Sequence, residues 1–182
     1  MKDEINIGTI TDSNYTQHTG VMMFSMMKNC SKPSKLHFYI MDGGIDEKGK
    51  NILREICKDF KAKISFVKPD LSVFNGLKIG AHLTPIIYAK LLFPTLIKGV
   101  NKIIVMDSDI IVEGDINELF TMPLNGKILG AVPDGCVELQ ESCKKNLGMN
   151  PENEYFNSGV MLVDSSKWKK NKVLQKVMKF IK

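Results

Sequence analysis

The sequence has no apolar run long enough to cross a membrane, because a transmembrane helix needs about 20 consecutive, mostly apolar residues. Its first residues, Met1-Lys2-Asp3-Glu4, lack the apolar core of a signal peptide, so we expect a protein that is not exported. It also has no glycine-rich dinucleotide-binding pattern between a strand and a helix, which disfavours NAD and FAD as ligands. These absences predict a cytoplasmic protein.

Cysteine is scarce and scattered in this chain. The four cysteines show no close-paired spacing of the kind that binds zinc, and without export we expect reduced thiols rather than a disulfide framework. A Cys136–Cys143 bridge is the alternative that spacing alone leaves open. The formal net charge of +5 is moderate and fits solvated lysine-rich faces better than a phosphate-bearing partner, so we expect no nucleic-acid partner.

The length and composition predict one domain. The chain has 182 residues, of which 43% are apolar and 25% charged, enough for one hydrophobic core and too few for two. Apolar periodicity predicts strands alternating with helices in the first part of the chain, which is typical of a parallel sheet with right-handed crossovers and of the α/β class. The predicted strands are Ile5–Thr11, Leu36–Met41 and Lys63–Val67, and the predicted helices are Tyr15–Asn29 and Glu47–Phe60, the second capped by Asp46.

The first predicted helix is rich in methionine. Four methionines lie at helical spacing, and we expect them to pack in the core rather than to line a ligand groove; they are Met22, Met23, Met26 and Met27. We expect the inward face of this helix to carry Val21, Met22, Phe24, Ser25 and Met26.

The later elements follow from the same patterns. Thr84-Pro85 starts a helix that Pro94 ends or kinks, and Asp115 caps a brief helix through Phe120. The predicted strands are Lys102–Met106, Lys127–Val132 and Val160–Val163, with a helical or irregular excursion over Val137–Glu154. An amphipathic helix begins at Val173, and its apolar stripe fits docking against the sheet better than lying on an anionic membrane.

Two aspartates follow the most apolar of these strands. The run Ile103–Met106 ends at Asp107, and Asp109 comes two residues later. Ligands of open α/β sheets bind beyond the carboxyl ends of the strands, and two adjacent carboxylates stay ionised most easily around a cation. Carboxylate oxygens suit Mg²⁺ and Mn²⁺. We therefore predict a divalent-metal site here; the alternative is a pair of solvated turn residues.

A second candidate site follows the first strand, at Thr11-Asp12-Ser13-Asn14-Tyr15. In a doubly wound sheet this loop lies beside a bound nucleotide. Asp12 and Asn14 offer hydrogen-bond partners for a base or ribose, and Tyr15 offers a stacking face. Helix capping by the same residues is the alternative explanation.

Four segments, taken in order, resemble glycosyltransferase family 8. They are Thr11-Asp12-Ser13-Asn14-Tyr15, Tyr88-Ala89-Lys90, Val105-Met106-Asp107-Ser108-Asp109 and Tyr155-Phe156-Asn157-Ser158-Gly159-Val160-Met161. This family holds retaining, nucleotide-sugar-dependent enzymes such as bacterial lipopolysaccharide galactosyl- and glucosyltransferases and glycogenin.

The resemblance implies a GT-A fold, a Rossmann-like α/β single domain with a mostly parallel central sheet flanked by helices. The domain would span residues 1–182 and lack its C-terminal part. The resemblance also implies a Mn²⁺ or Mg²⁺ ion, a UDP-hexose donor carrying galactose or glucose, and a saccharide or lipid-linked glycan acceptor of the lipopolysaccharide type. Peripheral association with the inner face of the membrane is a further expectation.

The same resemblance assigns roles to individual residues. It implies that Asp107 and Asp109 bind the metal, and that these two with Ser108 contact the diphosphate. Asn157 and Asp134 are the candidate catalytic residues beside the sugar. The donor-contacting set is completed by Thr11, Asp12, Asn14, Tyr15 and Leu83 around the uridine, by Lys90, and by Asn157, Ser158 and Gly159 against the sugar.

Two departures from the family pattern matter. Lys90 stands where members usually have arginine, which keeps the charge and loses the planar bidentate fork. The later Asp-Gln-Asp segment and the His-x-x-Gly region, which supplies the third metal ligand, do not follow the last predicted helix. His18, His37 and His82 do not fit that ligand role by position.

Two other functions compete with a transferase. One is an inactive nucleotide-sugar-binding fragment that lacks the acceptor half of the site. The other is a Mg²⁺-dependent haloacid-dehalogenase-type phosphatase, which also places Asp-x-Asp after an apolar strand. That family carries the motif on its first strand and wants Thr or Val where Ile111 stands.

Overall fold

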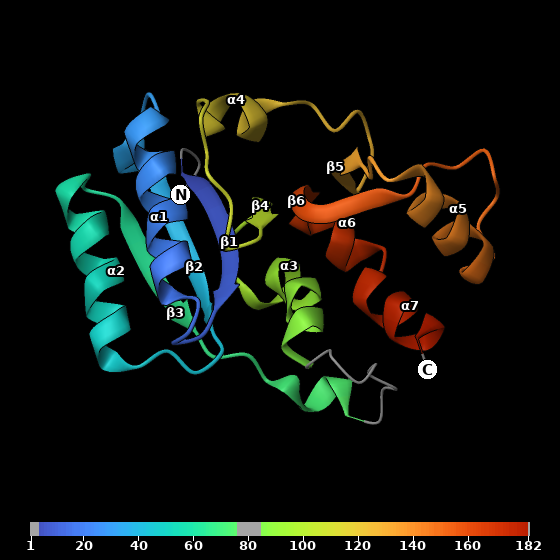
Figure 1. The fold of residues 1–182 in the computed structure, drawn as a ribbon, viewed down its shortest axis with the longest axis horizontal. Helices are drawn as coiled ribbons and strands as arrows, with labels where there is room; N and C mark the ends of the chain where they lie inside the picture. The colour runs from blue at the N-terminus through green and yellow to red at the C-terminus, as the bar shows by residue number, and fades with distance from the viewer. Residues whose placement is uncertain (1–3, 76–84, 182) are drawn as a thin grey trace.

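The structure, a computed structural model, describes residues 4–75 and 85–181. It holds a six-stranded sheet in the order β3-β2-β1-β4-β6-β5 with helices on both faces (Figure 1). The strands are β1 (Ile5–Thr11), β2 (Leu36–Asp42), β3 (Lys63–Val67), β4 (Lys102–Met106), β5 (Leu129–Pro133) and β6 (Phe156–Asp164). The α-helices are α1 (Thr16–Asn29), α2 (Glu47–Asp59), α3 (Phe93–Leu96), α4 (Ile116–Thr121), α5 (Val137–Asn146), α6 (Ser165–Lys170) and α7 (Val173–Phe180), and 3₁₀ segments lie at η1 (Pro33–Lys35), η2 (Leu71–Phe74) and η3 (Pro85–Leu92).

The predicted α/β class is confirmed, and the sheet is parallel in one half and antiparallel in the other. β1 pairs in parallel with β2 and with β4, and β2 pairs in parallel with β3. β6 runs antiparallel to both β4 and β5. Consequently the amino end of β6 lies at the same edge of the sheet as the carboxyl end of β4.

Each face of the sheet has its own hydrophobic core. On one face α1 and α2 pack over the parallel strands, with Met22, Leu53, Phe38 and Ile104 completely buried. On the other face α3, α6 and α7 pack over β4 and β6 around Phe93, Trp168 and Met178. Figure 1 shows these two helical layers on either side of the sheet. The apolar stripe of α7 is thus docked in the core, as the sequence predicts.

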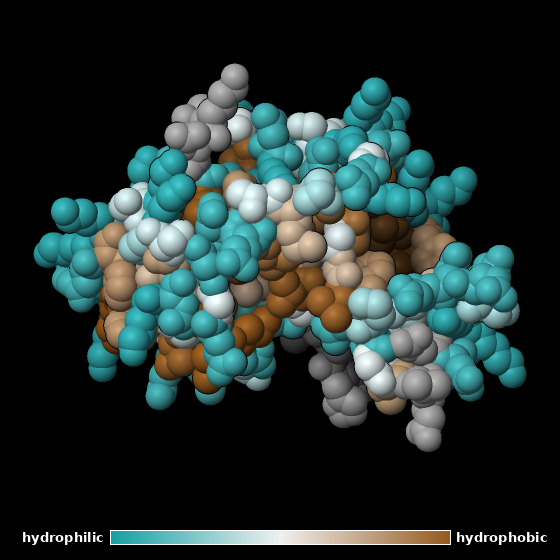
Figure 2. Space-filling model, turned by 90° about the horizontal axis from the view of Figure 1, so that it is seen from above, coloured by the Kyte–Doolittle hydropathy of each residue, from teal (hydrophilic) through white to brown (hydrophobic). Residues whose placement is uncertain are grey.

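The inward face of α1 differs from the prediction at two positions. Met22, Met23, Met26 and Met27 are all buried, so the methionines do pack in the core. However, Val21 and Phe24 are 49% and 48% exposed, because the helix turns its methionine pairs rather than these two residues toward the sheet. Figure 2 shows apolar surface on the left, the side on which α1 and α2 lie in Figure 1.

Two boundaries and one additional helix also correct the prediction. Pro94 lies in the first turn of α3 and starts that helix, where its missing N–H leaves no bond unmade. The last strand begins at Phe156 rather than Val160, since its first residues pair with Val132 and Pro133 of β5. α6 is an additional short helix, and Asp164 caps it by accepting from the Lys167 N–H at 2.8 Å.

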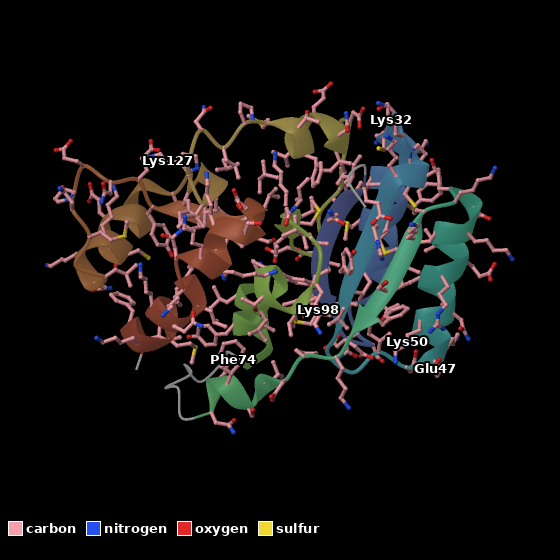
Figure 3. The ribbon with its side chains drawn as sticks, turned by 180° about the vertical axis from the view of Figure 1, so that it is seen from behind. Lys32, Glu47, Lys50, Phe74, Lys98 and Lys127 are labelled. Carbon is pink, nitrogen blue, oxygen red and sulfur yellow. The ribbon has the colours of Figure 1, made fainter. Side chains whose placement is uncertain are left out.

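Side-chain caps mark where helices α2 and α4 begin. Asp46 caps α2 by accepting from the Gly49 N–H at 2.6 Å, and Asp115 caps α4 through the Asn117 N–H at 3.0 Å. Lys50 reaches Glu47 at 3.3 Å, and Figure 3 shows these two side chains together at the start of α2. Among the described residues, no helix is both long and apolar enough to span a bilayer.

Candidate functional site

The candidate site lies where the strand order changes direction. The chain leaves β1 toward β2 and β3, whereas β4 on the other side of β1 continues to β6 and β5. β1 and β4 are paired in parallel, so their carboxyl ends lie side by side at one edge, and the strands that follow lie on opposite sides of them. In α/β sheets ligands bind in the crevice that such a switch point creates.

Asp107 is the first residue after β4 and is fixed by its backbone. Its N–H donates to the Gly159 carbonyl at 2.9 Å, which joins the carboxyl end of β4 to the amino end of β6. Ser108 is buried, while Asp109 is exposed and makes no hydrogen bond or ion pair with any described residue. Two carboxylates therefore follow a buried strand at this edge, as the sequence predicts.

Lys90 joins this carboxylate cluster from η3. Its ammonium donates to Asp107 Oδ1 and also reaches the Ser158 carbonyl at 3.3 Å. The Lys90 side chain is 20% exposed, so the ion pair is shielded from water on one side. One cation thus connects three segments that are far apart in the sequence.

Gly159 leaves room that no other residue would leave. A Cβ atom at this position would lie 2.8 Å from Asn157 Oδ1 and 3.1 Å from Asp107 Oδ2. The Gly159 N–H donates to Asn157 Oδ1 at 2.7 Å. The absence of a side chain therefore lets the Asn157 amide and the Asp107 carboxylate both lie close to the Gly159 backbone.

Asn157 also faces the residue that follows β5. Its Nδ2 donates to Asp134 Oδ2 at 3.4 Å, and the Asp134 N–H donates to the Tyr155 carbonyl at 2.9 Å. The pairing of Pro133 with Phe156 brings these groups together. Nearby, a hydrogen bond with Cys143 raises the pKa of Tyr155, a contact that no sequence pattern predicts.

The loop after β1 makes the turn-closing hydrogen bonds that the alternative interpretation expects of it. Asp12 Oδ1 accepts from the Asn14 and Tyr15 N–H groups at 2.9 and 3.0 Å, so Asp12 does close the turn that starts α1. Thr11 Oγ1 donates to the Asp12 carbonyl at 3.3 Å. Tyr15 is 49% exposed, and its ring centroid lies 5.4 Å from that of His18. The turn thus presents Asn14 and Tyr15 outward.

The structure therefore brings together nearly all of the predicted site residues. The loop after β1, the Asp107–Asp109 turn, the Asp134 turn and the Asn157–Gly159 segment lie at the same edge of the sheet. Leu83 lies outside the described residues.

The donor set at this edge is suited to a hard cation. Asp107 Oδ2 and the exposed Asp109 carboxylate are oxygen ligands of the kind that Mg²⁺ and Mn²⁺ prefer. Among residues 4–75 and 85–181, no cluster of three His, Cys, Asp or Glu side chains is positioned to hold a metal ion. Such ions commonly take one or two carboxylates and complete their shell with phosphates and water, so the residues present fit this mode of binding.

Comparison with known proteins agrees with this arrangement. The family model described as "Glycosyl transferase family 8" matches residues 6–182. General stress protein A of Bacillus subtilis (strain 168) is 31% identical over 183 residues, covering 99% of this chain and 63% of that protein. Lipopolysaccharide 1,2-glucosyltransferase of Escherichia coli (strain K12) is 26% identical over 181 residues, covering 97% of this chain and 52% of that protein.

A solved structure shares the fold. The crystal structure of galactosyltransferase LgtC in complex with donor and acceptor sugar analogs superposes with a TM-score of 0.85 and 26% identity. The match covers 97% of this chain and 64% of the LgtC chain. The present chain thus spans between about half and two thirds of the length of these relatives.

Proposed function

Because the chain belongs to glycosyltransferase family 8 and has the GT-A fold, we propose that it forms the donor-binding part of a retaining hexosyltransferase. The enzyme takes galactose or glucose from a UDP-sugar and passes it to a saccharide or lipopolysaccharide-type acceptor. The observation that carries this proposal is the convergence of Asp107–Asp109, the β1 loop and Asn157–Gly159 at one edge of the sheet.

The diphosphate end of the donor is assigned to the β4 turn. Asp107 and Asp109 hold Mn²⁺ or Mg²⁺ in this proposal, and the ion, when bound, neutralises charge on the departing diphosphate. Ser108 lies between the two aspartates in the sequence and is buried, and it is assigned to the same diphosphate contact. Lys90 keeps Asp107 aligned and places a second positive charge beside the Ser158 carbonyl. In this proposal the metal ion and the Lys90 ammonium both attract the diphosphate of the donor.

The uridine is assigned to the loop after β1. Asp12 uses Oδ1 to close the turn, which leaves Oδ2 as an acceptor for a ribose or base donor. Asn14 is exposed beside it, and Tyr15 offers an aromatic face to the base. Thr11 and Leu83 complete this set on the strength of the family resemblance.

The sugar is assigned to the β5–β6 side of the site. Asn157 Nδ2 and Asp134 Oδ2 form a donor–acceptor pair, and such a pair can bind neighbouring hydroxyl groups in both senses. Ser158 and Gly159 present backbone there, and Gly159 keeps the space in front of Asp107 open. In this proposal Asn157 and Asp134 orient the sugar at the reacting face.

A thermal-shift experiment tests donor binding. UDP-glucose or UDP-galactose together with Mn²⁺ should raise the melting temperature, because a ligand that binds only the folded state stabilises it. Asp109→Asn should remove the metal-dependent part of the shift and leave the melting temperature without ligand nearly unchanged. Absence of any shift with millimolar UDP-sugar and Mn²⁺ would refute the proposal.

Turnover separates transfer from binding alone. The described residues supply two carboxylates and no third protein ligand to a metal. This observation supports the alternative function, a unit that binds the donor without transferring the sugar. Transfer, or slow hydrolysis of UDP-sugar, favours the enzyme; a thermal shift without either favours the binding unit. A phosphatase is not favoured, because the aspartate pair follows β4 rather than the first strand and the family model is that of glycosyltransferases.

A further inference from the structure

Two side chains of α1 bind both backbone polar groups of Val112. The Val112 N–H donates to Ser25 Oγ at 3.0 Å, and the Val112 carbonyl accepts from Asn29 Nδ2 at 2.7 Å. Val112 belongs to the segment that connects β4 to α4, which runs beside α1 (Figure 1). We call these two hydrogen bonds the Val112 clamp.

The geometry of α1 allows two of its side chains to reach one residue. Ser25 and Asn29 are four positions apart in the helix, so they lie on one face, a turn apart. The Ser25 hydroxyl donates to the Met22 carbonyl at 2.9 Å, which leaves its oxygen free to accept from Val112. The Asn29 side chain is exposed, and water could bind the Val112 carbonyl in its place. The clamp therefore orders the segment, and burial alone does not require it.

The same segment carries Asp109 between two fixed points. On the amino side, the Asp107 N–H donates to the Gly159 carbonyl at 2.9 Å. On the carboxyl side, Ile110 and Val112 pack against the core below α1, and the clamp holds the second of them. Asp109 is exposed and makes no hydrogen bond or ion pair with any described residue. The position of its carboxylate is therefore set by the backbone on either side.

We propose that Ser25 and Asn29 are positioning residues for the candidate metal site. They act through the backbone of Val112 to hold the Asp109 carboxylate at the carboxyl end of β4. This inference rests on the proposed function, in which Asp109 is one of the two carboxylates that bind Mn²⁺ or Mg²⁺. A segment that is free beyond Asp109 has to be ordered when the ion binds, and this ordering lowers the affinity. A segment that is already held in place avoids that loss.

A double variant tests the role of the clamp in metal binding. Ser25→Ala with Asn29→Ala removes both hydrogen bonds and leaves every proposed metal and donor contact in place. At a fixed, saturating UDP-glucose concentration, the Mn²⁺ concentration that gives half of the thermal shift should rise by about 10- to 100-fold, as is typical when groups that orient metal ligands are removed. Ser25→Thr alone keeps the hydroxyl and should retain the Mn²⁺ affinity of the unmodified protein.

A matched double variant controls for stability. Ser166 Oγ donates to Asn101 Oδ1 at 3.1 Å, and Asn171 Nδ2 donates to the Lys167 carbonyl at 2.8 Å. Ser166→Ala with Asn171→Ala therefore removes two comparable hydrogen bonds, but beside the amino end of β4, at the opposite edge of the sheet. The Mn²⁺ concentration for half of the shift should stay unchanged in this control, even where its melting temperature without ligand falls.

Deuterium exchange reports on the clamp without any metal. The peptide covering residues 108–113 should exchange faster in the Ser25→Ala, Asn29→Ala variant than in the unmodified protein or the control. Faster exchange with an unchanged Mn²⁺ requirement would overturn the proposal, as would an equal loss of Mn²⁺ affinity in the control. Failure of the proposed function is recognised separately, because the unmodified protein itself would then show no Mn²⁺-dependent shift with UDP-glucose.

Discussion

The Lys90 ammonium donates to Asp107 Oδ1 and, from the same position, reaches the carbonyl of Ser158. This ion pair connects η3 to the ends of β4 and β6. Lysine holds the pair as a point charge, whereas arginine would offer a planar fork to both oxygens of the carboxylate.

Lys90→Met tests the importance of that charge. The change leaves Asp107 without its cation and removes positive charge from the proposed diphosphate site. Loss of a charged hydrogen bond of about 1.5–3 kcal/mol should weaken UDP-sugar binding by about one to two orders of magnitude, measured by calorimetry in the presence of Mn²⁺. Lys90→Arg should retain most of the affinity.

Lys98→Met provides the matched control, because Lys98 is exposed and has no ion pair with any described residue. Figure 3 labels the side chain of Lys98. If Lys90→Met and Lys98→Met bind the donor equally well, Lys90 has no role in donor binding.

Gly159→Ala should disable the site while the fold survives. The new Cβ would lie 2.8 Å from Asn157 Oδ1 and 3.1 Å from Asp107 Oδ2, so the Asn157 amide must move. We expect the UDP-sugar and Mn²⁺ thermal shift to be lost, with a decrease of about 1–3 kcal/mol in the free energy of unfolding. Gly114→Ala, where a Cβ meets nothing within 4 Å, should leave both quantities unchanged; a full thermal shift in Gly159→Ala would contradict this account.

Glu4, which directly precedes β1, should make the free energy of unfolding depend on pH. A hydrogen bond from Lys63 at 2.6 Å is the main cause that lowers the pKa of Glu4, with a further contribution from His37, which lies 3.3 Å away. A carboxylate with a lowered pKa stabilises the folded state above the pKa of the unfolded chain, and this stabilisation is lost as pH falls through the folded-state value.

Glu4→Gln should therefore reduce the free energy of unfolding at neutral pH by about 1 kcal/mol or less, and the difference from the unmodified protein should vanish in acid. Urea denaturation at the two pH values measures it. Glu113→Gln, at an exposed residue without an ion pair among the described residues, should show no such pH dependence. A Glu4→Gln difference that grows toward acid would have the wrong sign.

The cysteines should differ in reactivity by their burial. Cys57 is buried, and this burial raises its pKa to about 12; burial also raises the pKa of Cys30. Cys136 is exposed, and Cys143 is half-buried beside Tyr155. Because the thiolate is the reactive species, iodoacetamide should modify Cys136 first and leave Cys30 and Cys57 intact, as followed by peptide mass spectrometry.

In denaturant all four cysteines should react. Early modification of Cys57 in the native protein would mean that the packing between α2 and the sheet opens readily.

The parallel half of the sheet follows closely from the sequence, because alternating apolar strands and amphipathic helices leave one simple arrangement. The direction of β6 does not, since periodicity is the same for a parallel and an antiparallel strand. Val21 and Phe24 mislead because apolar residues next to the methionines satisfy the same helical pattern. Met23 and Met27 are buried, so the face of α1 that packs on the sheet is the one that carries the methionines.

The candidate site is predictable in composition and less so in its contacts. Asp107 and Asp109 stand out because an apolar run ends at them, and Asn157–Gly159 stands out by its resemblance to the family. The Lys90–Asp107 ion pair and the need for glycine at position 159 depend on how β4 and β6 pair. That pairing joins residues more than fifty positions apart, so no local pattern contains it.

The sheet order also fixes a sequence of events during synthesis. β5 leaves the ribosome before β6, yet β6 is its only partner in the described sheet. β5 therefore has no strand to pair with until residues 156–164 have been synthesised and form β6 between it and β4. A nascent chain that ends before Phe156 already holds the four parallel strands and the Asp107–Asp109 turn, but it lacks the Asn157–Gly159 wall. The Asn157–Gly159 side of the candidate site is therefore completed last, and before it arrives β4 is an edge strand of the parallel half-sheet.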